Sequence, residues 1–259
     1  MTTAQIVLIG LFIYLGSIGS IVGNTIGWYC LGRPLVASFV VGCILGNVPA
    51  AMAVGIPLQI MYMGNVTPGG AVAWDLSYAT YIGTAGALIF GRGMGTTELI
   101  GLAVVFAGIG GLVGQLMWNV TYALNLPLNR VAQRYAEAGE TKKMFIPNVV
   151  LGQIIGFLCR FIPAVIVLTS MTAASAQADF ASMIPGWVTT VLGVFGGMMA
   201  ALGMGIILSF LYKKQYHIVI FLAGFILVTY LKLSIMAAAV IAVIVAVLYF
   251  VAASKKEAQ

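Results

Sequence analysis

Eight apolar runs fill most of this 259-residue chain and leave room for few other fold classes. Hydrophobic residues make up 62% of the sequence and charged residues only 7%, whereas an average soluble domain is about one quarter charged. Apolar runs of about 20 residues have the length that crosses a bilayer as an α-helix. The sequence therefore predicts an all-α, polytopic transmembrane protein with one membrane-embedded domain over 1–259. The runs are 6–31, 34–63, 68–90, 99–124, 148–170, 186–212, 216–231 and 233–253.

The longest polar connection lies at 125–147 and holds four basic residues against two acidic ones. We expect a short amphipathic helix within it. Positive charge in short loops marks the cytoplasmic side of a membrane. We therefore predict that 125–147 is a cytoplasmic loop. By the same rule, the last two runs form a hairpin that turns at Lys232.

The run 34–63 is too long for one straight span and contains the break Gly46-Asn47-Val48-Pro49. Split there, it gives two pieces that are each too short to cross a bilayer alone. Short apolar segments interrupted by Pro and Gly are typical of transporter binding sites, where freed backbone groups must be buried in protein or line a cavity. The sequence therefore predicts a re-entrant hairpin or discontinuous helix between 34 and 75, within a site-forming core at 34–90.

The stretch GNVTPGGAVAWDLSYA at 64–79 is polar for so apolar a chain and contains Asp75, one of only six acidic residues. An ionised acid at membrane depth costs at least about 2.5 kcal/mol. Two interpretations stay open: Asp75 accepts hydrogen bonds from a polar solute, or it lies near an interface or pairs with a structural arginine such as Arg33. Uncharged amides and hydroxyls around a carboxylate suit a sugar, and a Gly-Gly pair lets backbone groups approach it. Trp74 could stack on a sugar ring or serve as a packing or interfacial aromatic. The predicted substrate-binding residues are Gln59, Asn65, Thr67, Gly69, Gly70, Trp74 and Asp75, with Arg33, Ser77 and Arg160 as secondary candidates.

The sequence offers little for catalysis. One histidine, His217, and six scattered acids do not assemble into paired carboxylates, a nucleophile–base pair or a metal cluster. The three cysteines have no metal-binding spacing, which is typical of small apolar side chains in helices. No basic run alternates with aromatics. We therefore expect no catalytic residue, no metal, no cofactor and no nucleic-acid partner.

Several stretches together point to a family. They are TTAQIVLIGLFIY near the N-terminus, RPLVASFVVGCILGN at 33–47, GIPLQIMYMGNVTPGGAVAWD at 55–75 and FIPAVIV at 161–167. In them the chain resembles the membrane IIC subunit of the mannose/fructose/sorbose class of bacterial sugar phosphotransferase systems. Two positions depart from the family's pattern. Gln59 replaces the usual glutamate and Trp74 stands where proline is common, and both fall in the predicted sugar site.

The resemblance implies a non-catalytic, sugar-translocating subunit of the bacterial inner membrane. It would bind a hexose-type sugar and present it for phosphorylation by a cytoplasmic IIB subunit, which carries a phosphohistidine and is recharged from phosphoenolpyruvate through IIA. The implied partners are a IID membrane subunit, IIA, IIB, the sugar and membrane lipid, in a hetero-oligomer. The basic segments 125–147 and Lys213–Lys214 would be docking surfaces for the cytoplasmic subunits.

The residues alone leave other functions open. An ion-coupled secondary transporter of a small polar solute would use Asp75 to carry a proton or sodium. A membrane-embedded enzyme would need a catalytic cluster, and a channel or non-transporting assembly partner would show no saturable sugar binding.

Overall fold

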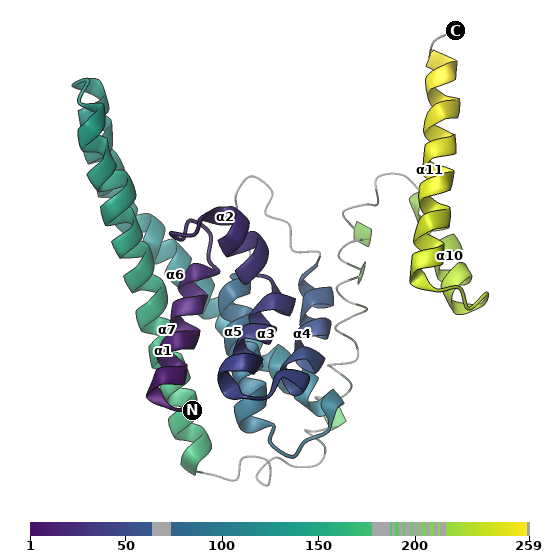
Figure 1. Cartoon of the computed structure of the whole chain (residues 1–259), viewed down its shortest axis with the longest axis horizontal. Helices are drawn as coiled ribbons and strands as arrows, with labels where there is room; N and C mark the ends of the chain where they lie inside the picture. The colour runs from purple at the N-terminus through teal and green to yellow at the C-terminus, as the bar shows by residue number, and fades with distance from the viewer. Residues whose placement is uncertain are drawn as a thin grey trace. The chain divides into compact units, whose positions relative to one another are not determined.

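The computed structural model of the chain describes residues 1–63, 74–177 and 216–257, together with isolated positions between 187 and 212. Every regular element in these ranges is a helix, which confirms the predicted all-α fold (Figure 1). The chain divides into two compact units, Met1–Ile206 and Ile207–Gln259. The single domain over 1–259 stays a prediction.

Helices long and apolar enough to cross a bilayer occur in the first unit. Two such segments are found in the described ranges, Thr96–Glu137 and Thr141–Ser175. The pair Gly23–Leu31 and Pro34–Leu45 is bent by 76° at its break and makes a third if it is counted as one span. Several shorter apolar helices accompany them, which agrees with the predicted mixture of full spans and broken helices.

The first unit begins with α1 (Thr3–Leu15), whose N-terminus is closed by a capping box between Thr2 and Gln5. A short α2 (Gly23–Ile26) and a π-helical turn η1 (Gly27–Leu31) follow it. This irregular connection leaves backbone groups without helical partners, so other elements must supply hydrogen bonds to them.

The predicted break at 46–49 is present. Helix α3 (Pro34–Leu45) ends at Gly46, whose φ of 76° is a left-handed conformation that favours glycine. Helix α4 (Val48–Tyr62) begins at once, because the Asn47 side chain accepts a hydrogen bond from the backbone N–H of Ala50. The two helices have 12 and 15 residues and pack as a tight hairpin. This confirms that neither crosses a bilayer alone.

Helix α5 (Leu76–Phe90) forms the centre of the unit, and all of its residues except Leu88 are buried. It packs against α6 (Thr96–Glu137) through glycines. A Cβ atom on Gly83 would lie 2.8 Å from the Cβ of Ala107, and one on Gly110 would lie 2.7 Å from the Tyr78 carbonyl oxygen. Small residues therefore bring the two backbones close together, as is common between membrane helices.

Helix α6 is longer than the sequence predicted. Its 42 residues, at a rise of about 1.5 Å each, span about 63 Å, roughly twice the thickness of a bilayer's hydrocarbon core. The expectation of a separate short helix in a polar loop was wrong, because 125–137 continues α6 through Pro127 without a break. The helix stops where Gly139 adopts a φ of 71°.

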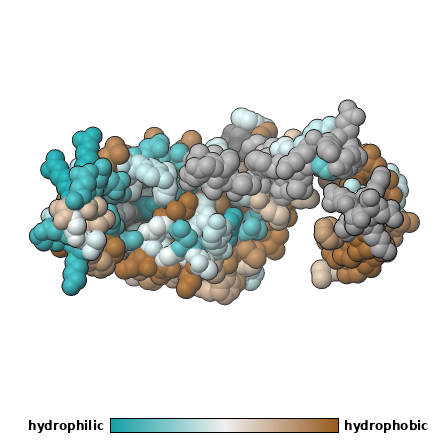
Figure 2. Space-filling model, turned by 90° about the horizontal axis from the view of Figure 1, so that it is seen from above, coloured by the Kyte–Doolittle hydropathy of each residue, from teal (hydrophilic) through white to brown (hydrophobic). Residues whose placement is uncertain are grey.

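After this stop the chain turns back through η3 (Thr141–Met144) and η4 (Ile146–Leu151) into α7 (Gly152–Gln177). The end of α6 and the start of α7 thus form a helical hairpin that projects from the rest of the unit (Figure 1). Hydrophilic residues gather at its tip (Figure 2).

The second unit contains the hairpin of α10 (Tyr216–Thr229) and α11 (Ile235–Glu257). Lys232, between them, has a φ of 54°. The Ser234 hydroxyl accepts a hydrogen bond from the backbone N–H of Ala237 and so helps to start α11. The predicted turn at Lys232 is confirmed.

Candidate functional site

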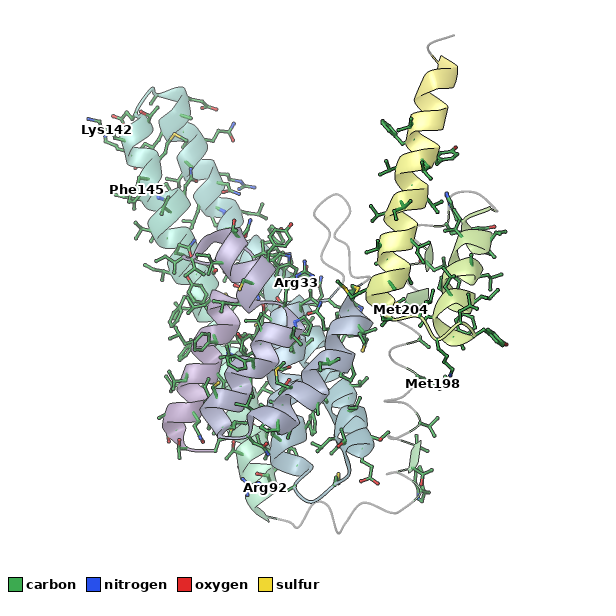
Figure 3. The ribbon with its side chains drawn as sticks, turned by 45° about the vertical axis from the view of Figure 1, so that its right-hand side comes forward. Arg33, Arg92, Lys142, Phe145, Met198 and Met204 are labelled. Carbon is green, nitrogen blue, oxygen red and sulfur yellow. The ribbon has the colours of Figure 1, made fainter. Side chains whose placement is uncertain are left out.

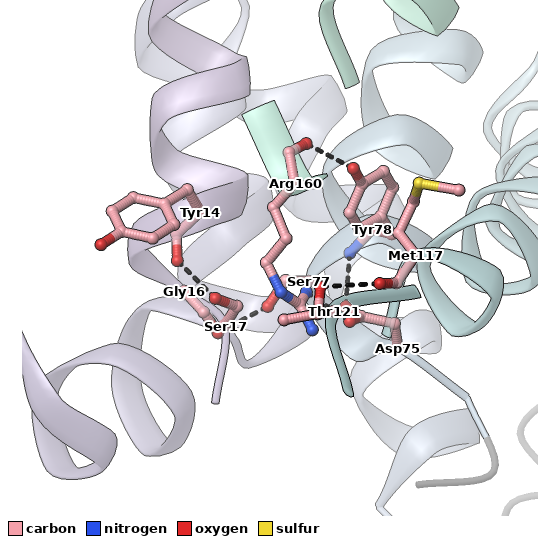
Figure 4. Close-up of polar contacts among 9 residues, drawn as sticks. All are labelled: Tyr14, Gly16, Ser17, Asp75, Ser77, Tyr78, Met117, Thr121 and Arg160. Atoms are coloured by element: carbon pink, nitrogen blue, oxygen red, sulfur yellow. Dashed lines mark hydrogen bonds and ion pairs between the residues drawn. The ribbon is translucent and has the colours of Figure 1, made fainter. Parts of the chain in front are cut away.

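A buried ion pair joins α5 to α7. The Arg160 Nη1 lies 2.5 Å from Asp75 Oδ2, and each of the two residues is 2% exposed (Figure 4). The other carboxylate oxygen of Asp75 accepts the backbone N–H of Tyr78 at 3.1 Å, so the same side chain caps the N-terminus of α5. Of the two interpretations of Asp75, pairing with a structural arginine is present, but the partner is Arg160 and not Arg33.

Two further contacts hold Arg160. Its guanidinium lies 5.0 Å from the centroid of the Trp118 ring on α6, within the range of a cation–π interaction. Its backbone carbonyl accepts the hydroxyl of Tyr78. Arg160 therefore ties together α5, α6 and α7 in the first unit.

Polar side chains of α5 also satisfy the irregular connection that follows α1. The Ser77 hydroxyl donates to the Gly16 carbonyl at 2.5 Å, and the Tyr81 hydroxyl donates to the Leu31 carbonyl at 3.0 Å. Ser77 is completely buried. These freed backbone groups lie before the region predicted at 34–75, and protein side chains bond to them as the membrane requires.

Arg33 precedes the first turn of α3, and Gln59 lies in α4 with its side chain against that turn. The Gln59 side-chain oxygen accepts the backbone N–H of Leu35 at 3.3 Å. The Arg33 guanidinium lies 6.0 Å from the Trp28 ring centroid and 5.5 Å from that of Tyr29 (Figure 3). Both residues therefore support the start of the α3–α4 hairpin.

The remaining predicted residues divide into two groups. Asn65, Thr67, Gly69 and Gly70 lie outside the described residues. Trp74 is 39% exposed and lies against α6, since a Cβ atom on Gly111 would approach its ring to 2.8 Å. The structure thus brings Asp75, Ser77 and Arg160 into one polar cluster with Trp74 beside it.

A cavity of about 170 Å³ lies beside Arg160. Its walls come from the end of α1 and the turn after it, from one face of α6, and from the start of α7. Sequence reasoning found only Arg160 among its residues. The sequence held one signal for the cavity. Polar and aromatic side chains recur every three to four residues along α6, and so share one face of the helix, at Trp118, Thr121, Tyr122 and Asn125. The cavity is lined by Tyr14, Ser17, Ile18, Gly19, Trp118, Thr121, Tyr122, Asn125, Gly152, Gly156 and Arg160.

Within the ranges that the structure covers, no three His, Cys, Asp or Glu side chains come close enough to hold a metal ion. The cluster and the cavity instead offer hydroxyls, amides, aromatic rings and one compensated charge. Such groups can bind and orient a polar solute.

Comparison with known proteins identifies the family. The profile of the PTS system sorbose-specific IIC component matches residues 3–248. The chain belongs to this family. It is 27% identical to the mannose-specific EIIC component of Escherichia coli K12 over 249 residues, covering 96% of this chain and 89% of that one. It is 28% identical to the sorbose-specific EIIC component of Lacticaseibacillus casei over 249 residues, which cover 96% of this chain and 85% of the relative.

A further relative and two solved structures agree with this family assignment. The chain is 27% identical to the fructose permease IIC component of Bacillus subtilis over 254 residues, covering 96% of this chain and 87% of the relative. A cryo-EM structure of the mannose transporter ManYZ in complex with microcin E492 has a chain with a TM-score of 0.53 and 27% identity, and each chain is covered to 96%. A further solved structure, described as a membrane protein, reaches a TM-score of 0.77 at 26% identity over 96% of each chain.

The protein is therefore a sugar-translocating membrane subunit of a phosphoenolpyruvate-dependent phosphotransferase system. It is a multi-pass protein of the bacterial inner membrane. It acts as a transport subunit, and other subunits carry the phosphoryl transfer. The resemblance inferred from the sequence is confirmed.

Proposed function

We propose that this subunit binds a hexose-type sugar in its polar core and presents it to a cytoplasmic IIB subunit for phosphorylation. The observation that carries the proposal is the family match over 3–248, joined to a buried polar cluster between the start of α5 and α7. Relatives named for mannose, fructose and sorbose support a hexose-type substrate.

The proposed contacts with the sugar come from Gln59, Trp74 and the segment that contains Asn65, Thr67, Gly69 and Gly70. Trp74 supports this role because 39% of its surface is exposed. Asp75 was predicted to bind the solute, and we now propose a positioning role for it instead. Because its carboxylate is already bound to Arg160 and to the start of α5, it positions Arg160 and does not offer itself to the solute.

We further propose that the subunit works in a hetero-oligomer with a IID membrane subunit and with cytoplasmic IIA and IIB. The similarity to a chain of the ManYZ transporter supports the membrane pairing. For IIB, the tip of the α6–α7 hairpin supplies a docking surface that projects from the unit (Figure 1).

Charge at this tip favours an acidic partner. Lys143 forms an ion pair with Glu140 at 2.9 Å, while the neighbouring Lys142 extends from the tip (Figure 3). Arg130 and Arg134 lie on α6, which leads to the tip. Positive charge that is exposed in this way speeds the encounter with an acidic surface.

The test is sugar uptake by cells that express this chain with its partner subunits. We expect uptake to require phosphoenolpyruvate and to yield phosphorylated sugar inside the cell. An uncoupler should leave the initial rate unchanged in cells supplied with phosphoenolpyruvate. Unmodified sugar that is accumulated and then lost on addition of the uncoupler would instead identify an ion-coupled secondary transporter.

A further inference from the structure

We propose that the cavity between α1, α6 and α7 is a sugar subsite of this transporter, one that holds a single neutral hydroxylated ring. This inference rests on the proposed function, because it assumes that a sugar passes through the first unit. It differs from the site predicted at 59–77, because no described residue of that stretch lines the cavity.

The size of the cavity limits its occupant to one small ring. Its volume is about 170 Å³. Pockets for drug-sized ligands measure about 300–1,000 Å³, whereas a cavity of about 150 Å³ holds one benzene ring. The ring of a monosaccharide therefore fits inside the cavity, and a second ring or a lipid chain would have to lie outside it.

The polar groups around the cavity include hydrogen-bond acceptors. The Ser17 hydroxyl donates to the Tyr14 carbonyl at 2.6 Å, and the Thr121 hydroxyl donates to the Met117 carbonyl at 2.7 Å (Figure 4). The Tyr14 hydroxyl likewise donates to the Gln153 side chain at 2.7 Å. Each hydroxyl has thus committed its hydrogen to the protein, and its oxygen remains able to accept a bond from a ligand hydroxyl.

Donors lie on the other walls. A guanidinium has five N–H groups, and Asp75 accepts one from Nη1 of Arg160. Asn125 adds a side-chain amide, which can both donate and accept. The mixture of donors and acceptors matches a ring whose hydroxyls do both.

Aromatic rings complete the enclosure. Trp118 and Tyr122 pack edge to face, with their centroids 4.9 Å apart, and both line the cavity. Such rings offer an apolar surface to the C–H face of a sugar while the hydroxyls point to the polar walls. This pattern of a few placed polar groups among aromatics is typical of small-molecule sites.

The charge balance favours a neutral ligand over an anion. Arg160 is the only residue of the lining with a formal charge, and Asp75 compensates it at 2.5 Å. A phosphate or carboxylate would have to compete with that bound carboxylate and would bring a second negative charge into a buried region. An uncharged sugar meets neither cost.

One glycine makes the proposal testable without disturbing the packing. A Cβ atom on Gly156 of α7 would meet no heavy atom within 4 Å, although Gly156 lines the cavity. Gly156→Leu therefore fills the cavity and leaves the helix intact. Gly108 on α6 is the matched control, because a Cβ atom there also meets nothing within 4 Å and Gly108 does not line the cavity.

The experiment measures equilibrium binding of radiolabelled mannose, fructose, sorbose and N-acetylgalactosamine to membrane vesicles that hold the full chain with its IID partner, without phosphoenolpyruvate. We expect Gly156→Leu to weaken binding of the accepted sugar at least tenfold and Asn125→Ala to weaken it about fivefold. Gly108→Leu and Asn119→Ala should bind as the wild type does, since Asn119 is an exposed asparagine on the same helix.

The same vesicles are then assayed for phosphorylation with phosphoenolpyruvate, IIA and IIB. If the wild type phosphorylates the sugar but Gly156→Leu and Asn125→Ala bind it normally, the subsite is refuted and the proposed function stands. Equal losses in the two control variants would also refute it, because the effect would not belong to the cavity. If the wild type neither binds nor phosphorylates any of the sugars, the proposed function fails and the subsite falls with it.

Discussion

The Asp75–Arg160 pair makes the sharpest prediction about stability. Both residues are 2% exposed and lie 2.5 Å apart, so removal of either charge leaves the other buried without its partner. Asp75→Asn removes the charge but keeps an acceptor for the start of α5, because asparagine caps helices as well as aspartate does. Arg160→Met removes the opposite charge and keeps much of the side chain's length.

The expected magnitude follows from burial. Breaking a buried ion pair by removing one partner costs about 3–5 kcal/mol, whereas replacing both partners is often close to neutral. We therefore expect each single variant to lose about 3–5 kcal/mol of unfolding free energy and the double variant to lose less than the sum by at least about 2 kcal/mol. Asp75→Ala should lose about 1 kcal/mol more than Asp75→Asn, because it also removes the cap.

The assay is unfolding of the purified protein in mixed micelles, titrated with sodium dodecyl sulfate and followed by circular dichroism. Lys143→Gln is the matched control. It breaks the Lys143–Glu140 pair, whose side chains are 59% and 43% exposed, and such surface pairs contribute about 0–1 kcal/mol. If Asp75→Asn and Arg160→Met lose no more than this control, and their effects simply add, the account of a buried coupled pair is refuted.

Three further predictions concern packing, the helix break and docking. Gly114→Ala should lower the unfolding free energy by about 1–3 kcal/mol, because its Cβ would lie 2.5 Å from the Asp75 Cβ. Gly108→Ala should leave the unfolding free energy unchanged, because its Cβ would meet no heavy atom within 4 Å. Equal midpoints of the two variants in the detergent titration would contradict this. Gly46→Ala should lose about 1–2 kcal/mol in the same titration, because its φ of 76° strains any residue with a Cβ. Lys142→Gln with Lys143→Gln should slow phosphorylation of the sugar by IIB at low salt and leave sugar binding unchanged; an unaltered rate would count against docking at the hairpin tip.

Local signals in the sequence were enough to predict the breaks in the helices. The Gly46-Asn47-Val48-Pro49 stretch holds a left-handed glycine, a capping asparagine and a proline in the first turn of α4. The turn at Lys232 likewise follows from charge between two apolar runs. Each of these features is decided within a few residues, so one sequence suffices to find it.

The partner of Asp75 could not be chosen in this way. The sequence suggested Arg33 as a structural partner and indicated Arg160 only as a secondary site candidate, and Arg160 lies 85 residues away from Asp75. Only the packing of α5 between α6 and α7 decides between them. The cavity escaped prediction for the same reason, since its walls come from three elements that are far apart in the chain.

The length of α6 was misjudged on different grounds. A change from apolar to charged residues near 125 was interpreted as the end of a helix, although α6 continues past it to Glu137. The helix continues through Pro127 to Glu137, and Gly139, with a φ of 71°, follows its end. Hydropathy predicts where a helix is in lipid, whereas backbone propensity decides where it ends.

The central claim is that this chain translocates a sugar and that the phosphoryl group comes from other subunits. Its most direct test is sugar phosphorylation by membranes that contain the chain, with and without IID, IIA, IIB and phosphoenolpyruvate, across a panel of hexoses, amino sugars and sugar derivatives. We predict a phosphorylated product that requires phosphoenolpyruvate and all of the partners and is lost when this chain is omitted. A product that forms equally well without this chain would contradict the claim, as would sugar that is accumulated unmodified and released by an uncoupler.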